Sequence, residues 1–368
     1  MIKKVLILIL TMTMAIGAFG QSLEETLSSM AGNNASMYTQ PLGDGMGAMM
    51  NSGYYHRSRV HKLLGFDISA KVMGIQVGDD EKFFNFSFEN AVIEYDLNDI
   101  ITTYTLEPIS ISLEDVYKGS NTRVPTISGS IDSIGVIKVN EDHLISVIEN
   151  QLIGQLTEEL GAAGAAVAVG QMSGVITTFV NQLIDLQIPG LGLSYMALPM
   201  LQASIGLPIG IELTVRALPE YDIEELGLLS MYGGGVRMSL DQFIPIPLFP
   251  LDITAGAFYS QMTIGDVFES KNTSVSLQVG KSINLLIVGV GVYADAGYET
   301  SSVSIAYVPD PKMGIGTDPI EFDLETDPGL RYGLGLHIKP VPFTHINLHV
   351  AQTPNNLVAT MGLAISIR

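Results

Sequence analysis

Three histidines near the end of the chain are the first residues whose type and spacing suggest chemistry. His345 and His349 are four residues apart. In a strand they would share a face but stand about 13 Å apart along it, too far for one metal ion to bind both. His337 lies on the preceding predicted strand, and cross-strand neighbours are about 5 Å apart, so it can approach one of them. One interpretation is a histidine metal site; the favoured one is a hydrogen-bonded network of polar side chains.

A run of carboxylates is the second candidate site. Four acidic residues alternate with apolar ones here: Glu321, Asp323, Glu325 and Asp327. Carboxylates on one strand face repel each other unless they are compensated. Hard oxygen ligands suit Ca²⁺, which makes a calcium site one hypothesis and calcium the one cofactor considered. The alternative is an acidic loop or strand that forms ion pairs with residues of the next strand.

The remaining isolated charges lie on the polar faces of predicted strands. Together with the three histidines, we place these side chains facing the interior of the protein: Glu212, Arg216, Arg237, Asp241, Lys281, Arg331 and Lys339. Rings of such charges tune the selectivity of pores. They are equally expected in an interior filled by salt bridges without a pore, and the sequence leaves both alternatives open.

The segments that carry these residues are predicted to be β-strands. Apolar and polar residues alternate over 209–217, 331–339, 345–350 and 357–367, which is the period of a strand with two different faces. A soluble sandwich and a membrane barrel both produce this pattern. The cleanest runs have about 9–11 residues, the length that a tilted membrane strand needs. We therefore predict an all-β fold, an antiparallel transmembrane β-barrel of roughly 12–16 strands, with about 14 preferred.

The alternation breaks over residues 141–190. Asn140 is a candidate N-cap, and Glu141 and Asp142 follow in the first turn, where carboxylates suit the helix dipole. Apolar residues recur at helical spacing over 144–160 and again over 172–184. A helical hairpin insert is the expectation, either plugging the barrel or lying on its periplasmic rim. A single transmembrane helix in this segment is the less favoured interpretation.

The first twenty residues have the pattern of a secretory signal peptide. Two lysines precede an apolar stretch, and small residues stand before Gln21, so cleavage after Gly20 is predicted. The expected organisation is a signal peptide (1–20), a glycine-rich segment (21–60), a first β region of the barrel (61–140), the helical insert (141–190) and the main barrel region (191–368). We expect the protein to be exported to the outer membrane.

Composition excludes several classes of function. The 368 residues carry a formal net charge of −20, although only 15% of them are charged. Nucleic-acid binding is not expected, because phosphate contacts need a basic surface. The chain has no cysteine, so thiolate metal sites, cysteine nucleophiles and a lipidated cysteine anchor are excluded. Phosphate-loop and nucleophile-elbow motifs are also missing. We predict that the protein is not an enzyme.

Several motifs resemble one family. They are YTQPLGDG at 38–45, NSGYY at 51–55, HKLLGFDI at 61–68, PMLQASIGLP at 199–208, GGVR at 234–237, DQFIP at 241–245, PLD at 250–252 and GLAISIR at 362–368. The chain is similar here to an uncharacterised Bacteroidota family of predicted outer-membrane proteins, a domain of unknown function. The resemblance implies a barrel in the outer membrane and no particular chemistry. The terminal Arg368 departs from the aromatic residue that often ends such chains.

These observations lead to three hypotheses. The first is an outer-membrane barrel that admits small or hydrophobic solutes, in a porin-like manner, past a helical plug. The second is a barrel with a structural or binding role and no transport, and the third is a soluble periplasmic β-protein. The expected partners are the lipid bilayer and, under the first hypothesis, small hydrophobic solutes.

Overall fold

The computed structural model describes residues 32–367 except 89–90, 99–100, 102, 224–226, 246–249, 286–287, 308–319 and 327. Its chain forms two compact units. The first unit contains residues up to 82, then 126–130 and 191–368. The second contains 83–125 and 131–190. The predicted signal peptide lies outside the described residues.

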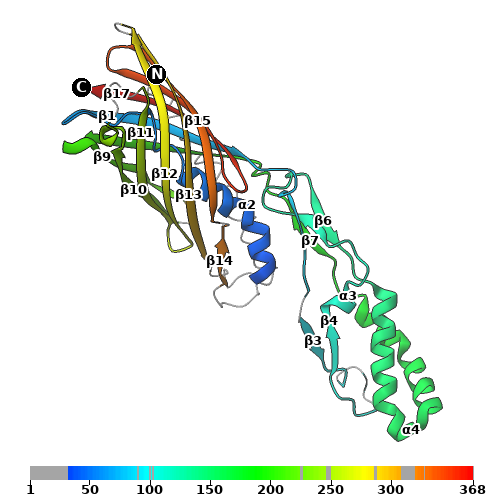
Figure 1. Cartoon of the computed structure of the whole chain (residues 1–368). Helices are drawn as coiled ribbons and strands as arrows, with labels where there is room; N and C mark the ends of the chain where they lie inside the picture. Colours follow the sequence, from blue (N-terminus) through cyan, green and yellow to red (C-terminus); the bar gives the residue numbers. More distant parts are fainter. Residues whose placement is uncertain are drawn as a thin grey trace. The chain divides into compact units, whose positions relative to one another are not determined.

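The first unit is an antiparallel β-barrel (Figure 1). Its strands are β1 (Phe66–Gln76), β8 (Tyr195–Gly206), β9 (Ile211–Ile223), β10 (Gly227–Ser239), β11 (Asp252–Ile264), β12 (Phe268–Leu285), β13 (Val288–Tyr307), β14 (Ile320–Glu325), β15 (Gly329–Val341), β16 (Thr344–Gln352) and β17 (Leu357–Ile367). The sheet closes on itself. β1 pairs with β17 as well as with β8, and β12 pairs with β13 as well as with β11, so every strand of the ring is paired on both sides. Short 3-10 turns, η1 (Pro208–Gly210) and η2 (Asp241–Phe243), follow β8 and β10.

Ten strands close the ring, and the predicted barrel is confirmed with fewer strands than the 12–16 expected. Within the described residues, β14 pairs with β13 alone, next to the stretch of β13 that pairs with β15. β14 therefore continues the line of β15 along β13 and adds no strand to the ring. The overestimate has a simple cause. Two alternating runs, near 285–294 and 301–308, belong largely to the single 20-residue strand β13.

The two faces of each strand separate by polarity as the alternation predicts. In β17, exposed and buried residues alternate without interruption, with Met361 and Ile365 outside and Thr360 and Ser366 inside. Along β15, Leu334 is 71% exposed whereas Arg331 is buried. The barrel therefore carries its apolar side chains outward and its polar ones inward, the reverse of a soluble protein.

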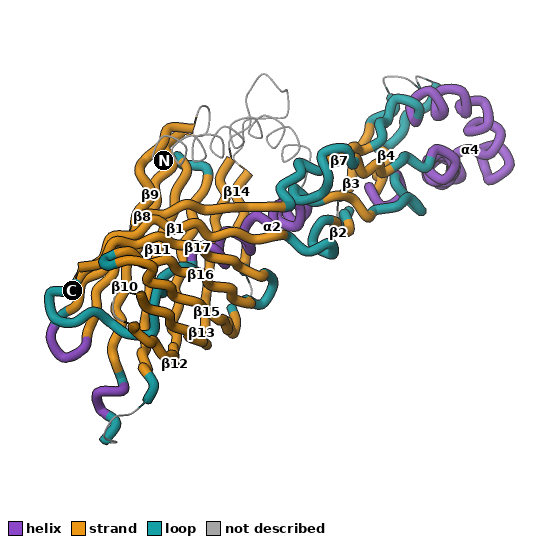
Figure 2. Tube along the Cα trace, turned by 90° about the horizontal axis from the view of Figure 1, so that it is seen from above, coloured by secondary structure: helices purple, strands orange, loops and turns teal. Residues whose placement is uncertain are grey.

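A helix and a loop from the N-terminal region fill the barrel. Figure 2 shows helix α2 (Gly32–Met50) beside the strands, and residues 51–65 lead from it into β1. The end of α2 packs into an apolar cluster of inward-pointing side chains that is rich in methionine. Ala48, Met49 and Met50 of the helix contact this cluster, to which β1 contributes Met73 and Ile75. This part of the lumen is a dry core.

The second unit combines three small sheets with helices. The paired strands are β2 (Phe83–Asn85) with β5 (Arg123–Pro125), β3 (Val92–Tyr95) with β4 (Ile109–Ser112), and β6 (Ile134–Ile137) with β7 (Leu186–Pro189). A short helix, α3 (Leu113–Val116), follows β4. These strands correct the expectation that 61–140 forms a first β region of the barrel. Within the described part of this range, only β1 joins the barrel, and the later strands have four residues or fewer.

Helix α4 (Glu141–Val180) is the predicted hairpin. Asn140 caps it by accepting a hydrogen bond from the His143 N–H. Gly161 interrupts it at φ 72° and ψ 161°, and the two halves run side by side (Figures 1 and 2). By length and composition α4 is the one described helix that could cross a membrane. The break at Gly161 leaves about 20 residues in each half. α4 belongs to the second unit, whereas α2 and the loop that follows it belong to the first.

Candidate functional site

The inward face of β1 shows how the interior of the barrel is layered. Its buried residues run in the order Asp67, Ser69, Lys71, Met73 and Ile75. The apolar end meets helix α2 and the charged end meets the loop that follows α2. The interior therefore changes from a methionine-rich core to a buried polar layer within one strand.

In the polar layer, barrel side chains bind the backbone of residues 50–57, called here the lumen segment. Arg216 donates to the carbonyls of Met50 and Ser52, and Arg331 donates to that of Asn51 at 3.0 Å. Lys71 donates to the carbonyls of Gly53 and Tyr55. A glycine is required at position 53, where φ is +78° and the chain turns.

Three further barrel side chains bind the remaining carbonyls of the lumen segment. Gln202 donates to the Tyr54 carbonyl at 3.2 Å, Asn347 to the His56 carbonyl at 3.4 Å and Arg237 to the Arg57 carbonyl at 2.9 Å. Each of the eight consecutive carbonyls of the lumen segment thus accepts a hydrogen bond from one of these six side chains. These six lie on six different strands, namely β1, β8, β9, β10, β15 and β16. Such bonding satisfies backbone groups that would otherwise be buried without water.

Aromatic side chains of the lumen segment add packing to these hydrogen bonds. Tyr54 stacks on Phe258 with ring centroids 4.0 Å apart, and Tyr55 meets the same ring edge-on. The Arg216 guanidinium lies over the Tyr54 ring at 3.6 Å. Desolvated cation–π contacts of this kind are among the stronger ones. The segment is fixed both by its backbone and by its side chains.

A deeply buried ion pair joins Arg237 to Glu212 at 2.9 Å, and both side chains are at most 1% exposed. Glu212 also accepts a hydrogen bond from the His61 backbone N–H at 2.8 Å. Arg237 donates in addition to Gln278 at 2.7 Å. Removing one partner of a buried pair leaves an uncompensated charge. Because Arg237 also binds the Arg57 carbonyl of the lumen segment, the loss of either charged side chain would disturb both the segment and the barrel strands.

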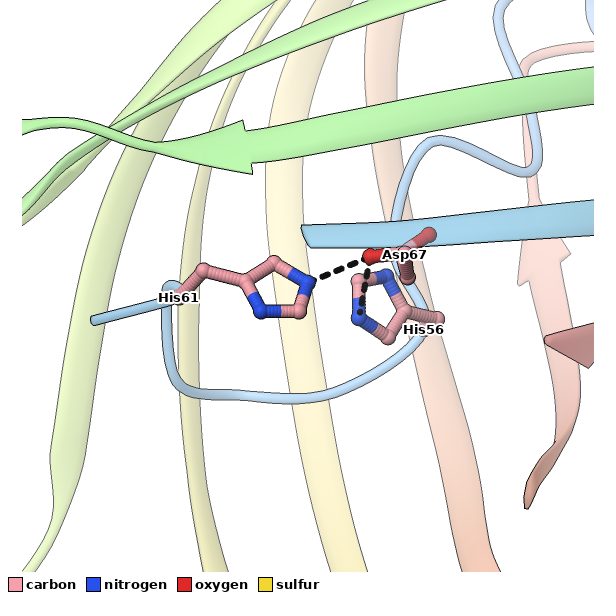
Figure 3. A group of neighbouring side chains, drawn as sticks. All are labelled: His56, His61 and Asp67. Atoms are coloured by element: carbon pink, nitrogen blue, oxygen red, sulfur yellow. Dashed lines mark hydrogen bonds and ion pairs between the residues drawn. The ribbon is translucent and has the colours of Figure 1, made fainter. Parts of the chain in front are cut away.

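Next to this pair, two histidines converge on one carboxylate (Figure 3). His61 Nε2 lies 2.5 Å and His56 Nε2 lies 3.3 Å from the same oxygen, Asp67 Oδ2. All three residues are at most 2% exposed. Burial lowers the pKa of His56 well below its ordinary value, and the charges of Arg57 and Lys71 lower it further. This imidazole is therefore neutral at pH 7.

The three histidines considered from the sequence divide into two contacts. His337 Nε2 lies 2.7 Å from His345 Nδ1, and the rings stack. The predicted approach of His337 to one of the other two is therefore observed. His349 instead lies 2.6 Å from Asp295, which also lies 3.9 Å from Arg331. These contacts form the hydrogen-bonded network that was the favoured interpretation.

The other predicted lumen residues separate into three groups. Glu212, Arg216, Arg237 and Arg331 are buried inside, as predicted. Lys339 shares the inward face of β15 and is half-buried. Two placements are wrong. Lys281 is exposed, because the inward residues of β12 are the even-numbered ones, and Asp241 lies in η2, where it accepts a hydrogen bond from Ser239 at 2.6 Å.

The acidic run does not converge in its described part. Glu321 and Asp323 are exposed, and Asp323 accepts a hydrogen bond from Ser304 at 2.7 Å on the neighbouring strand. Leu324, between the acidic positions, points into the apolar cluster. The side chain of Glu325 and all of Asp327 lie outside the described residues. The two described carboxylates therefore lie on the outer face of β14 and do not line the lumen.

Sequence reasoning missed the cluster of His56, His61 and Asp67. The histidines precede the first strand, in a stretch without periodicity, and nothing in a single sequence shows that this stretch enters the barrel. One available signal was the alternation of Asp67, Ser69 and Lys71 with Phe66, Ile68 and Ala70, which places Asp67 on the inward face.

Comparisons with known proteins give one family match and weak structural likenesses. The sequence profile of a family of unknown function (DUF6588) matches residues 1–367. No curated protein matches the chain. Ail of Yersinia pestis is 13% identical over 42% of this chain and 94% of its own, with a TM-score of 0.22. A triple mutant of the Rhodopseudomonas blastica porin is 10% identical over 48% and 94%, with a TM-score of 0.16. The fold assignment rests on the strand pairing instead.

Proposed function

We propose, from the premise that this chain belongs to the DUF6588 family of unknown function, that it is an outer-membrane barrel which does not transport solutes. In this proposal the barrel is closed by its own lumen segment. It acts as a structural or binding protein that holds the second unit at the membrane.

The outer surface of the barrel supports a place in a lipid bilayer. Large apolar side chains are exposed on every strand of the closed ring, among them Ile68, Val215, Val292, Leu334 and Met361. Soluble monomers rarely expose contiguous apolar surface larger than a few hundred Å². An apolar outer face around a polar interior is the arrangement of a transmembrane barrel. A soluble periplasmic protein would carry this surface at the cost of aggregation.

The lumen segment is the observation that carries the second half of the proposal. Passage of a solute would require breaking hydrogen bonds to eight carbonyls that are held from six strands. Hydrogen bonds from charged donors contribute about 1.5–3 kcal/mol each. A cavity of about 20 Å³ beside α2, lined by Asp44 and Glu299 among others, has room for about one water molecule.

The test is conductance of the purified chain in planar bilayers, with a boiled-versus-unboiled gel shift to establish that the barrel is folded. We expect a gel shift and no conductance for the unaltered protein. Arg216→Ala combined with Arg331→Ala removes donors to three carbonyls, and we expect it to open intermittent conductance. Lys271→Ala, on the outer face of β12, is the control and should remain silent. Stable conductance of the unaltered protein would contradict the proposal.

A further inference from the structure

We propose that His56, His61 and Asp67 form a binding site for one divalent transition-metal ion, with Zn²⁺ as the best fit. The ion would join the loop that follows α2, which carries both histidines, to the first strand of the barrel, which carries Asp67. The proposal does not depend on whether the barrel conducts.

The donor set selects the class of metal. Two imidazole nitrogens and one carboxylate oxygen are borderline ligands that suit Zn²⁺ and its neighbours in the first transition row. Ca²⁺ and Mg²⁺ prefer six or more oxygen ligands, which this cluster does not offer. One ligand atom from each of the three residues lies within 4.8 Å of the other two.

The spacing of the donors is close to that of a metal site. Ligands about 2.0–2.1 Å from a tetrahedral Zn²⁺ are roughly 3.3 Å from each other. The His56 Nε2 to Asp67 Oδ2 distance is 3.3 Å. The corresponding distance from His61 Nε2 is 2.5 Å, so that pair must open by roughly 0.8 Å on binding.

The unmet hydrogen-bonding capacity of the cluster points to a missing ligand. Within the described residues, neither ring nitrogen of His56 has a hydrogen-bond partner, and Asp67 Oδ1 has none either. His56 Nε2 contacts Asp67 without hydrogen-bond geometry. Buried polar groups are rarely left in this state, because an unpaired group costs about 1–3 kcal/mol. A metal ion bound to His56 Nε2 would satisfy that atom.

The loop that carries the histidines is held in place from both sides. Ser58 and Arg59 bind Asp252 of β11 at 3.1 and 2.7 Å, and the His61 backbone N–H binds Glu212 of β9. These contacts fix the backbone between the two histidines independently of any ion. The site is therefore organised before a metal arrives, which favours tight binding.

The test measures metal bound by the full chain in detergent. The protein is stripped with a chelator, dialysed against Zn²⁺ and analysed for zinc by mass spectrometry. We expect one Zn²⁺ per chain, and loss of that stoichiometric zinc in His61→Gln and in Asp67→Asn. The matched control is His349→Gln, which alters another buried histidine–aspartate pair of the same lumen and should retain the zinc. The gel shift reports whether each variant has folded.

Two results would overturn the proposal. The first is no stoichiometric Zn²⁺ on the unaltered chain, which would make the cluster a hydrogen-bonded network only. The second is equal loss of zinc in His349→Gln and in the site variants. If the site variants fail to fold, X-ray absorption of the zinc-loaded unaltered protein decides the question, because it must show two imidazoles and an oxygen around the metal.

Discussion

Six side chains from six strands bind a single stretch of backbone in the lumen, and three of them are arginines. Arginine suits this task because its planar group offers five donors and stays charged at all relevant pH values. One arginine can therefore reach two carbonyls, as Arg216 does with Met50 and Ser52. A lysine in its place would keep the charge and lose the planar, two-pronged donor group, although Lys71 also reaches two carbonyls. The donors and the segment they bind form one cooperative unit.

Arg237 offers the sharpest test of this unit. Arg237→Met leaves Glu212 charged and buried without its partner, so we expect the free energy of unfolding to fall by about 3–5 kcal/mol. Lys271→Met removes an exposed pair with Glu269 and should leave the free energy of unfolding almost unchanged, because solvent screens such a pair. Denaturant titration of the barrel in lipid vesicles measures both. If both substitutions changed the free energy of unfolding equally, the buried pair would contribute no more to stability than the exposed one.

Glu81, just beyond the end of β1, should make stability depend on pH. Burial, together with the nearby Asp44 and Asp80, raises the pKa of its carboxyl to about 7. The unfolded chain then loses this proton near pH 4.5 and the folded chain near pH 7, so stability declines as the pH rises between these values. Glu81→Gln should abolish that decline.

The measurement for Glu81 is the unfolding midpoint at pH 5 and at pH 8. We expect Glu81→Gln to raise the midpoint at pH 8 and to change it little at pH 5. Glu321→Gln replaces an exposed carboxylate and serves as the control, with little effect at either pH. A gain of equal size at both pH values would contradict the assignment.

At the scale of elements, the break in α4 depends on one glycine. Gly161 combines φ 72° with ψ 161°, a region that side-chain-bearing residues almost never adopt, whereas Gly154 lies in a regular part of the helix. A methyl group meets no atom within 4 Å at either position. Gly161→Ala should therefore destabilise the second unit by about 1–3 kcal/mol through backbone strain alone.

Gly154→Ala is the matched control and should stabilise the helix by about 0.5–1 kcal/mol, because alanine favours helix over glycine. Thermal unfolding followed by circular dichroism compares the two variants. Two stabilising substitutions would mean that the hairpin can straighten at Gly161.

Sequence alone predicts the elements better than it predicts their partners. Alternation placed Arg216, Arg237 and Arg331 on the inward face because each strand has a polar and an apolar side. Lys281 was misplaced, since β12 runs for 18 residues and a shift of one residue reverses its faces. The filling of the lumen by residues 51–57 could not be predicted, because it depends on contacts between segments separated by up to about 290 residues.

On the scale of the whole molecule, closure depends on the pairing of β1 with β17. Deleting residues 357–367 removes β17 and leaves the edges of β1 and β16 unpaired, so we expect no folded barrel and no gel shift. Replacing 141–180 with a short linker should preserve the gel shift, because α4 belongs to the other unit and β6 pairs with β7 across its base. A heat-modifiable barrel without β17 would show that closure does not depend on this seam.

The pairing of β1 with β17 also sets an order of events during folding. The lumen segment precedes β1, and the ring closes only when β17, the last strand, meets β1. Residues 50–57 must therefore be inside before the final strand is in place, or Arg216, Arg237 and Arg331 are sealed in without partners. Strand β17 thus helps to enclose a segment that lies before β1 in the sequence. A barrel that closed too early would be a kinetic trap, and the chain could leave it only by separating β1 from β17 again.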